Sequence, residues 1–300
     1  MDKKTCIVIV GPTAVGKTSL SLQLAKHFTT EIISADSRQC FKELNIGVAK
    51  PPDAALNSIK HYFINSHSIH DVVNAQVFEQ YALNAVEEIF KENDLAIMVG
   101  GTGMYIKAFC EGLDEMPDID SNVRNEVTNE YRKRGLNWLQ NEVRTHDPEF
   151  WQVAERQNPQ RLMRALEIVR ATGKSVVNFQ TRKKKERHFN LIKLGIEISK
   201  SQLHKNINER VDAMIKEGLI DEVRALTPYQ HFNALRTVGY QEIFEYFDRK
   251  SSLIDAIDKI KSHTSQYAKR QITWFKKDNI IKWANRQDLS SIISSGILLA

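Results

Sequence analysis

The sequence predicts an α/β protein in which helices flank a parallel sheet, with a helical insertion domain in the middle of the chain. Two observations predict the sheet. A short apolar run leads directly into a glycine-rich loop and a helix, and later apolar runs end in polar or glycine residues. A third observation predicts the insertion, because strand-like runs stop before residue 116 and resume at 191. We therefore expect a core of residues 1–115 and 191–300, with residues 116–190 inserted into it.

The glycine-rich loop lies between the apolar run Cys6–Val10 and a helical pattern that begins at Ser19. Glycines let the backbone wrap closely around a phosphate, and the N–H groups of the loop and the helix start supply positive potential. Lys17 adds a positive charge, and Thr18 offers a hydroxyl to Mg2+. This strand–loop–helix context predicts a P-loop NTPase-like core and disfavours a plain glycine turn. The expected diphosphate- or nucleotide-binding residues are Gly11, Pro12, Thr13, Ala14, Val15, Gly16, Lys17 and Thr18.

Length and composition exclude several classes of protein. The 300 residues suffice for one large domain or two smaller ones, and 42% hydrophobic with 26% charged residues is typical of a folded globular chain. No apolar run is long enough to cross a bilayer, and the first strand begins too early for a signal peptide. Cys6, Cys40 and Cys110 fit no metal spacing. These features favour a cytoplasmic location without a membrane partner.

A second apolar run, Glu31–Ala35, ends in Asp36 and further polar residues. In open α/β sheets, ligands bind at the carboxyl ends of the strands. We therefore expect the Asp36 carboxylate beside the phosphate site. The alternative is an aspartate that only shapes the turn after the strand.

A third apolar run, Leu95–Val99, ends in Gly100–Gly103. An ordinary ATPase would carry an aspartate there to hold its metal ion, so its absence counts against a motor or ATPase. The glycines indicate a second stretch of backbone that another group approaches closely.

Between these runs, helical periodicity predicts a packing helix from Phe78 to Phe90. His61, His67 and His70 precede it, but no carboxylate or cysteine stands at zinc spacing from them. We therefore interpret these histidines as surface or structural residues.

The predicted insertion holds the excess positive charge of the chain. Residues 116–190 contain fifteen Lys or Arg and ten Asp or Glu, and the rest of the chain is close to neutral. Such a concentration is the footprint expected for a nucleic-acid partner. For the basic run Arg182–Arg187, contact with phosphates and a solvated surface remain equal alternatives.

Helical patterns cover most of this insertion, at 118–134, 136–143 and Pro159–Arg170. In the last of these, Arg161 and Arg164 stand three residues apart and can point together. This pair is the better candidate for phosphate contact.

After the insertion, the patterns return to the core. They predict a strand at Leu191–Ile198, helices at Ser201–Lys216 and Ser252–Lys277, and a last short strand at Asn279–Trp283. Basic and aromatic residues near the end of the second helix suit nucleic-acid contact, although core packing explains Trp274 equally well.

Seven blocks of this sequence resemble one family closely, the bacterial tRNA dimethylallyltransferases, also called tRNA isopentenyltransferases. The first block is common to many P-loop proteins, but the order and combination of all seven are specific. Small departures at Phe41 and Met104 touch no expected chemical role, and the zinc finger of the eukaryotic relatives is missing. The blocks are Gly11–Thr18, Ser34–Gln39, Gly100–Tyr105, Asn158–Glu167, Asn208–Asp212, Leu235–Tyr240 and Tyr267–Phe275.

The resemblance implies transfer of a dimethylallyl group from dimethylallyl diphosphate to N6 of the adenosine 3′-adjacent to the anticodon, in tRNAs that read codons beginning with U. Asp36 is then the candidate base. Lys17, Mg2+ on Thr18 and, by family analogy, Arg210 stabilise the diphosphate leaving group. The expected partners are dimethylallyl diphosphate and a tRNA anticodon stem-loop, bound by a monomer. The tRNA contacts that the family implies are Asp36, Ser37, Arg38, Gln39, Thr102, Arg124, Gln160, Arg161, Leu162, Met163 and Arg164.

Three other functions compete with this interpretation. An adenylate isopentenyltransferase would use free adenine nucleotides, but such an acceptor needs no basic insertion. A P-loop small-molecule kinase would share the phosphate loop, but no arginine-rich lid is evident and the Gly100–Gly103 run speaks against it. A non-catalytic, nucleotide-gated RNA-binding protein would need neither Asp36 nor Arg210.

Overall fold

The computed structural model describes residues 4–181 and 183–289 of the chain. These form two compact units. The core unit comprises Met1–Gly112 and Glu186–Ala300, and the insertion unit comprises Leu113–Lys185.

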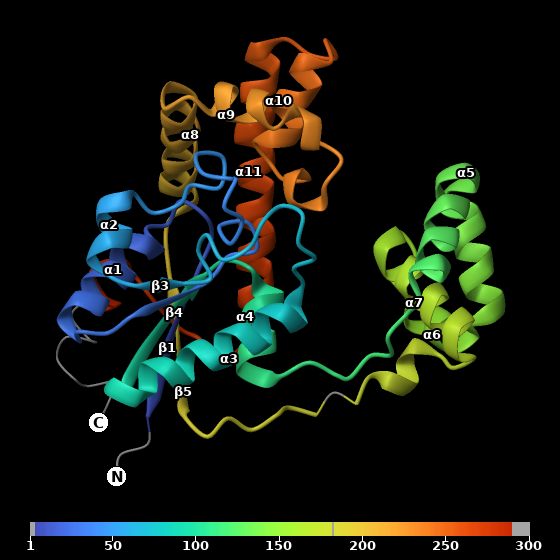
Figure 1. Cartoon of the computed structure of the whole chain (residues 1–300), viewed down its shortest axis with the longest axis horizontal. Helices are drawn as coiled ribbons and strands as arrows, with labels where there is room; N and C mark the ends of the chain where they lie inside the picture. Colours follow the sequence, from blue (N-terminus) through green and yellow to red (C-terminus); the bar gives the residue numbers. More distant parts are fainter. Residues whose placement is uncertain (1–3, 182, 290–300) are drawn as a thin grey trace. The chain divides into compact units, whose positions relative to one another are not determined.

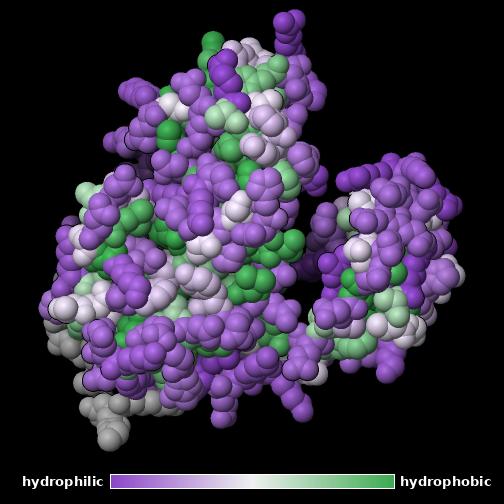
Figure 2. Space-filling model, viewed as in Figure 1, coloured by the Kyte–Doolittle hydropathy of each residue, from purple (hydrophilic) through white to green (hydrophobic). Residues whose placement is uncertain are grey.

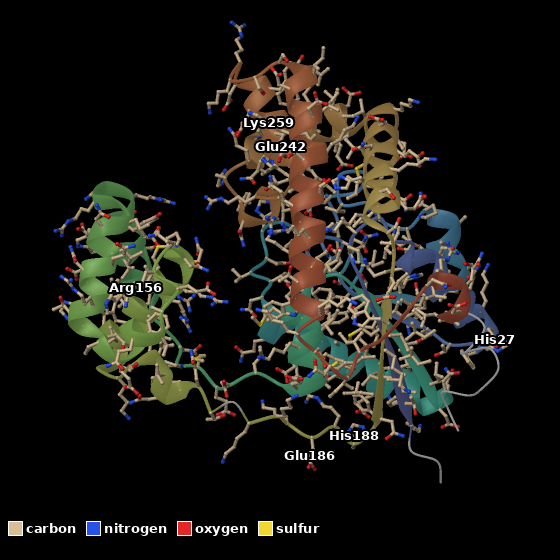
Figure 3. The ribbon with its side chains drawn as sticks, turned by 180° about the vertical axis from the view of Figure 1, so that it is seen from behind. His27, Arg156, Glu186, His188, Glu242 and Lys259 are labelled. Atoms are coloured by element: carbon tan, nitrogen blue, oxygen red, sulfur yellow. The ribbon has the colours of Figure 1, made fainter. Side chains whose placement is uncertain are left out.

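The insertion unit begins and ends slightly earlier than the predicted range 116–190, because the chain after it is already held by the core. Arg187 donates hydrogen bonds from Nε to the carbonyl of Phe109 at 2.7 Å and from Nη2 to that of Ala108 at 2.9 Å. Its Nη2 also pairs with Glu79 at 2.8 Å. Glu186 and His188, on either side of Arg187, lie where the chain re-enters the core (Figure 3).

The described part of the core unit contains one sheet of six parallel strands in the order β3-β2-β4-β1-β5-β6 (Figure 1). The central strand β1 is apolar because it is covered on both faces, and Cys6–Val10 are fully buried. The last strand lies slightly later than the predicted Asn279–Trp283. The strands are β1 (Thr5–Val10), β2 (Ile32–Ala35), β3 (His61–Tyr62), β4 (Leu95–Gly100), β5 (Asn190–Ile196) and β6 (Lys282–Ala284).

Helices cover both faces of this sheet. On one face, Val8 packs in a cluster with side chains of α3 and α4. On the other, Ile9 packs with Leu20 and Leu24 of α1. This alternation follows from the two-residue period of a strand. The helices of this half are α1 (Lys17–His27), α2 (Asp53–Ser58), α3 (Ala75–Glu92) and α4 (Gly103–Glu111).

The second half of the core unit is helical, and the long helix α11 is its main element (Figure 1). Ser252 starts α11 with a capping box, in which its hydroxyl accepts the N–H of Asp255 and the Asp255 carboxylate accepts the N–H of Ser252. α11 packs against α8 and α10 and also contacts α4. The helices of this half are α8 (Lys200–Lys216), α9 (Leu219–Ala225), α10 (Tyr240–Phe247) and α11 (Leu253–Phe275).

Polar pairs join α10 to α11. Glu242, a buried carboxylate, lies 2.6 Å from Nδ1 of His263 and accepts the N–H of Gly239 at 2.8 Å. Lys259 pairs with Glu245 at 2.9 Å. Figure 3 labels Glu242 of α10 and Lys259 of α11 near each other. These contacts fix α10, and with it the loop that precedes it, against the long helix.

The insertion unit has its own small core. α7 contributes Leu162 and Leu166, which are fully buried against Leu139 and Val143 of α5. The two helices predicted at 118–134 and 136–143 form the one assigned helix α5, with a break at Gly135, where φ is 76°. The α-helices of the insertion unit are α5 (Ser121–His146), α6 (Pro148–Val153) and α7 (Pro159–Thr172).

The visible surface of the insertion unit is mostly hydrophilic (Figure 2). Within residues 4–181 and 183–289, no helix is both long enough and apolar enough to cross a membrane.

Candidate active site

The glycine-rich loop joins the end of β1 to the start of α1. Gly16, the residue before α1, has a φ of 92°, a conformation in which a side chain would be strained. The helix therefore begins at Lys17 with the loop N–H groups gathered at its N-terminus, where they attract anions. This is the geometry predicted for residues 11–18.

Lys17 lies inside the loop rather than in solvent. Its Nζ donates to the carbonyls of Gly11 at 3.0 Å and Pro12 at 2.7 Å. The pKa of Lys17 is lowered to about 7, chiefly by burial and then by the charge of Arg210, while the charge of Asp36 opposes this shift. An arriving phosphate would favour the charged ammonium, because opposite charges raise the pKa of a lysine.

Asp36 follows β2 at the carboxyl edge of the sheet. Its Oδ1 accepts the N–H groups of Arg38 at 2.8 Å and Gln39 at 3.2 Å. Asp36 therefore shapes the turn, as one of the two sequence interpretations expected. Both bonds fall on Oδ1, so Oδ2 has no hydrogen bond among the described residues and can accept a proton from a ligand.

The turn that carries Asp36 is tied to the glycine run after β4. The hydroxyl of Thr102 accepts the N–H of Ser37 at 3.0 Å, and the N–H of Thr102 donates to the carbonyl of Ala35 at 3.2 Å. A Cβ on Gly100 would lie 2.2 Å from that same carbonyl. The sequence predicted that another group approaches these glycines closely, and at Gly100 that group is the backbone of Ala35.

At Gly101 and Gly103 the approaching groups come from α11. A Cβ on Gly101 would lie 2.1 Å from Nε2 of Gln271, and one on Gly103 would lie 2.2 Å from Nε1 of Trp274. Where an ordinary ATPase would carry an aspartate, this chain has glycines, and side chains of α11 pack directly against their backbone. Trp274 packs here and remains 36% exposed, and its contact with nucleic acid stays a prediction.

Two adjoining cavities meet at the Asp36 carboxylate. The first, of about 80 Å³, is lined by Lys17, Thr18 and Ser21 of α1 and by Ser34 of β2, among others. The second, of about 380 Å³, lies between the 47–48 backbone, α8, α11 and the loop before α10. Four residues line both cavities: Thr13, Asp36, Arg210 and Tyr267.

Arg210 reaches this junction from α8. Burial lowers the pKa of its guanidinium, while the charge of Asp36 opposes that shift. It also lines a third cavity outside the loop with Lys17 and Thr18. The structure thus brings four predicted residues, Lys17, Thr18, Asp36 and Arg210, around one small cavity.

The structure adds three residues that the sequence had not singled out for this site. Gln271 and Tyr267 lie in the last of the seven blocks, on the face of α11 that meets the cavity. His61 begins β3 and lines the same cavity, with Nδ1 bonded to the carbonyl of Ile59 at 2.7 Å. Burial lowers the pKa of its imidazole.

Gln39 and Arg38 bind different segments of the core unit. The amide of Gln39 donates to the carbonyls of Val48 at 3.2 Å and Ala49 at 3.0 Å, and thereby fixes the loop beside the second cavity. Arg38 donates from Nη1 to the carbonyl of Asn233 at 3.0 Å.

The remaining predicted tRNA contacts lie in the insertion unit. Arg161 pairs with Glu155 at 2.9 Å, whereas Arg164 bonds to Glu167 and to the carbonyl of Pro117, both at 3.4 Å. The two arginines therefore have separate partners within the insertion unit. Arg124 lies in α5 and Gln160 in the first turn of α7.

Two residues of the predicted tRNA-binding segment have buried side chains. Leu162 is fully buried and Met163 is 8% exposed. They hold α7 in the insertion core, so the side chains that this segment offers to a ligand are Gln160, Arg161 and Arg164.

Arg187 departs from the predicted basic surface run. Its side chain is 10% exposed and is occupied by Glu79 and the end of α4. The two alternatives for the run 182–187 were contact with phosphates and a solvated surface. Arg187 fits neither, because it is a structural residue. Arg182 lies outside the described residues.

A parallel sheet with a glycine-rich loop after its central strand β1, a lysine at the helix start and an aspartate after β2, one strand beyond β4, defines a P-loop NTPase-like protein. A family model described as IPP transferase matches residues 39–278, which is most of the chain. This chain therefore belongs to the IPP transferase family.

Relatives of known family are similar to this chain over nearly its whole length. A tRNA dimethylallyltransferase of Christiangramia forsetii is 48% identical over 277 residues, which is 92% of either chain. The tRNA dimethylallyltransferase 1 of Bacteroides thetaiotaomicron is 42% identical over 96% of this chain and 94% of that one.

Solved structures show the same likeness. A tRNA isopentenylpyrophosphate transferase from Bacillus halodurans matches with a TM-score of 0.72 and 31% identity, over 99% of this chain and 96% of that one. A eukaryotic dimethylallyltransferase acting on tRNA matches with a TM-score of 0.80 and 26% identity, over 99% of this chain and 80% of that one.

Proposed function

We propose that this protein is a tRNA dimethylallyltransferase. It transfers the dimethylallyl group of dimethylallyl diphosphate to N6 of the adenosine 3′-adjacent to the anticodon, in tRNAs that read codons beginning with U. The observation that carries the proposal is the junction of two cavities at Asp36, because one cavity carries phosphate-binding groups and the other opens beside the proposed base. The family membership supports the same reaction.

The donor's diphosphate binds the glycine-rich loop. The loop N–H groups, Lys17 and Arg210 surround the place where negative charge grows as the C–O bond breaks. An oriented donor of this kind is worth roughly 2.7–4 kcal/mol of barrier. The loop thus holds a leaving group, and no phosphoryl group is transferred.

Mg2+ is the metal that we propose for this site. The first cavity offers oxygen groups from Thr18, Ser21, Ser34 and Asp36, and hard oxygen ligands are those that Mg2+ prefers. The Thr18 hydroxyl would hold the ion together with diphosphate oxygens. When bound, the ion neutralises charge on the departing diphosphate.

Asp36 acts as the base. The exocyclic amine of adenine is a weak nucleophile, because its lone pair is delocalised into the ring. As N6 forms its bond to the terminal carbon of the dimethylallyl group, the bond from that carbon to the diphosphate oxygen breaks. Oδ2 of Asp36 takes the proton that N6 loses.

The acceptor base enters from the second cavity. Its volume of about 380 Å³ lies within the range typical of small-ligand pockets, about 300–1,000 Å³. Arginines at 38, 236 and 270 line this cavity and suit the phosphates around an extruded nucleotide.

The insertion unit grips the anticodon stem. Arg124, Arg161 and Arg164 supply cations for phosphates, and Gln160 adds a polar contact. RNA helices are recognised chiefly by shape and backbone, so this surface would contribute affinity more than sequence selection.

We propose that the protein is a monomer and that it acts on tRNA in the cytoplasm. Light scattering of the purified protein tests the monomer directly. A mass of twice the chain at working concentrations would overturn it.

The function is tested with labelled dimethylallyl diphosphate, Mg2+ and unmodified tRNA, with AMP in a parallel reaction. A matched tRNA with guanosine at the target position is the control. Label in the adenosine-containing tRNA alone supports the proposal. Label in AMP reassigns the acceptor, and label in neither nucleic acid nor nucleotide overturns the transferase.

A further inference from the structure

Gln271 connects the glycine-rich loop to the turn after β4. Its Oε1 accepts the N–H of Thr13 at 2.8 Å, and its Nε2 donates to the carbonyl of Gly101 at 2.9 Å. The side chain is 6% exposed, so both ends of a buried amide are satisfied. One side chain of α11 therefore holds two loops that lie 258 and 170 positions away in the sequence.

This contact withholds one N–H group from any ligand of the loop. The N–H of Thr13 would otherwise be free to donate to a phosphate oxygen, as the other loop N–H groups are. With Gln271 in place, the Thr13 N–H is covered by a buried amide that is itself held by the Gly101 carbonyl, so a phosphate cannot reach this N–H without displacing Gln271.

Gly101 makes this arrangement possible. A Cβ at that position would lie 2.1 Å from Nε2 of Gln271, so any other residue would push the amide out of place. Tyr267 and Trp274, one turn before and after Gln271, seat the same face of α11 against this edge of the sheet. The helix therefore cannot shift without leaving these contacts.

We propose that Gln271 is a positioning residue that sets the length of phosphate chain the loop accepts. It leaves enough N–H groups for a diphosphate, and it closes the Thr13 end against a third phosphate. This inference rests on the proposed function for its diphosphate donor. It explains how a P-loop discriminates the donor against nucleoside triphosphates, which share the same terminal diphosphate chemistry.

The test compares the binding of diphosphate and tripolyphosphate to the full chain by calorimetry, at one fixed concentration of free Mg2+. Gln271→Ala frees the Thr13 N–H and opens the space. We expect it to shift the preference toward tripolyphosphate by about five- to tenfold, the value of one hydrogen bond. Gln271→Met frees the N–H but fills the space, so it should keep the preference between diphosphate and tripolyphosphate close to that of the unchanged protein.

The matched control is Gln266→Ala, an exposed glutamine on the same helix. It should bind both ligands as the unchanged protein does. Gly101→Ala provides an independent route to the same result, because it displaces the Gln271 amide. Should Gln271→Ala fail to fold, the methionine and Gly101 variants carry the test.

A purely structural role for Gln271 predicts a different outcome. The affinities for diphosphate and tripolyphosphate would then fall by the same factor. The preference between them would stay unchanged, and the inference would be overturned. Unchanged protein that binds diphosphate but transfers no dimethylallyl group would overturn the proposed function alone. Full transfer activity with an unaltered preference in all Gln271 variants would overturn the inference alone.

Discussion

Tyr240 and Glu222 share a 2.5 Å hydrogen bond beneath the loop that borders the second cavity. Glu222 also accepts the N–H groups of Ile46 at 2.7 Å and Gly47 at 3.1 Å. The Tyr240 ring is fully buried under Gly47, where a Cβ would lie 2.5 Å from it. One carboxylate from α9 thus fixes both the loop and the start of α10.

Tyr240→Phe should lower the free energy of unfolding by about 1.5–3 kcal/mol, because it removes a hydrogen bond to a charged group. Urea denaturation measures this. The ring stays in place, so the loss reports the hydroxyl alone. Tyr246→Phe, a half-buried tyrosine of the same helix, is the control and should change little.

Asp36→Asn separates the two roles of Asp36. The amide oxygen can still accept the N–H groups of Arg38 and Gln39, but the side chain no longer takes a proton. We expect kcat to fall by about 10²–10⁴, the usual contribution of a general base, with an unchanged KM for dimethylallyl diphosphate. Steady-state kinetics with labelled donor give both values, and full turnover would rule out Asp36 as the base.

Because the pKa of Lys17 is lowered, we expect binding of the donor to depend on pH. In the free protein its pKa is about 7, so the ammonium loses its proton as pH rises from 6 to 9. A bound diphosphate raises that pKa again, and binding at pH 8 should therefore take up protons.

Calorimetry in buffers of different ionisation enthalpy counts these protons. Lys17→Arg keeps its charge throughout and should show only the titration of the ligand. Equal proton uptake by both proteins would contradict a neutral Lys17.

The Arg187–Glu79 pair should contribute to the stability of the core. Its side chains are 10% and 11% exposed, and breaking a buried pair costs about 3–5 kcal/mol. Glu79→Leu should therefore destabilise the protein strongly, and Glu79→Leu with Arg187→Leu less so than the single changes together. Urea denaturation measures all three. Glu87→Gln, beside the exposed His188, should stay within about 0.5 kcal/mol of the unchanged protein.

The arginines of the insertion unit should act on tRNA and not on the donor. Arg124→Gln and Arg161→Gln should each raise the KM for tRNA while the KM for dimethylallyl diphosphate stays constant. Each should also reduce the slope of log affinity against log salt by about 0.7–0.9 for every phosphate that the variant no longer neutralises. Filter binding at several salt concentrations measures the slope. Arg224→Gln, exposed on α9, is the control.

Much of the core was predictable because its signals are local. The apolar run Cys6–Val10, the glycine loop and the helix start are adjacent in sequence, so strand, turn and helix follow from one stretch. β3 was harder, because two residues, His61 and Tyr62, pair with β2 and give no period to detect.

Within the site, the sequence left two roles open for Asp36. The structure shows that Oδ1 shapes the turn while Oδ2 has no hydrogen bond among the described residues, and a pattern of residue types cannot distinguish the two oxygens. Gln271 could not be assigned from the sequence, because its contact with Thr13 joins residues 258 positions apart. The separate partners of Arg161 and Arg164 likewise depend on where Glu155 and Pro117 lie.

Arg187 has a consequence for how such a chain can vary. It binds the last turn of α4, from which the chain leaves the core, and it stands where the chain returns. Exit and return are thereby fastened at one point, and the sheet is completed without help from the residues between them. The insertion unit is a side branch of the fold, so a chain that joins Gly112 to Glu186 through a short linker should still form the core. The insertion unit and the core unit can therefore be exchanged or lengthened independently.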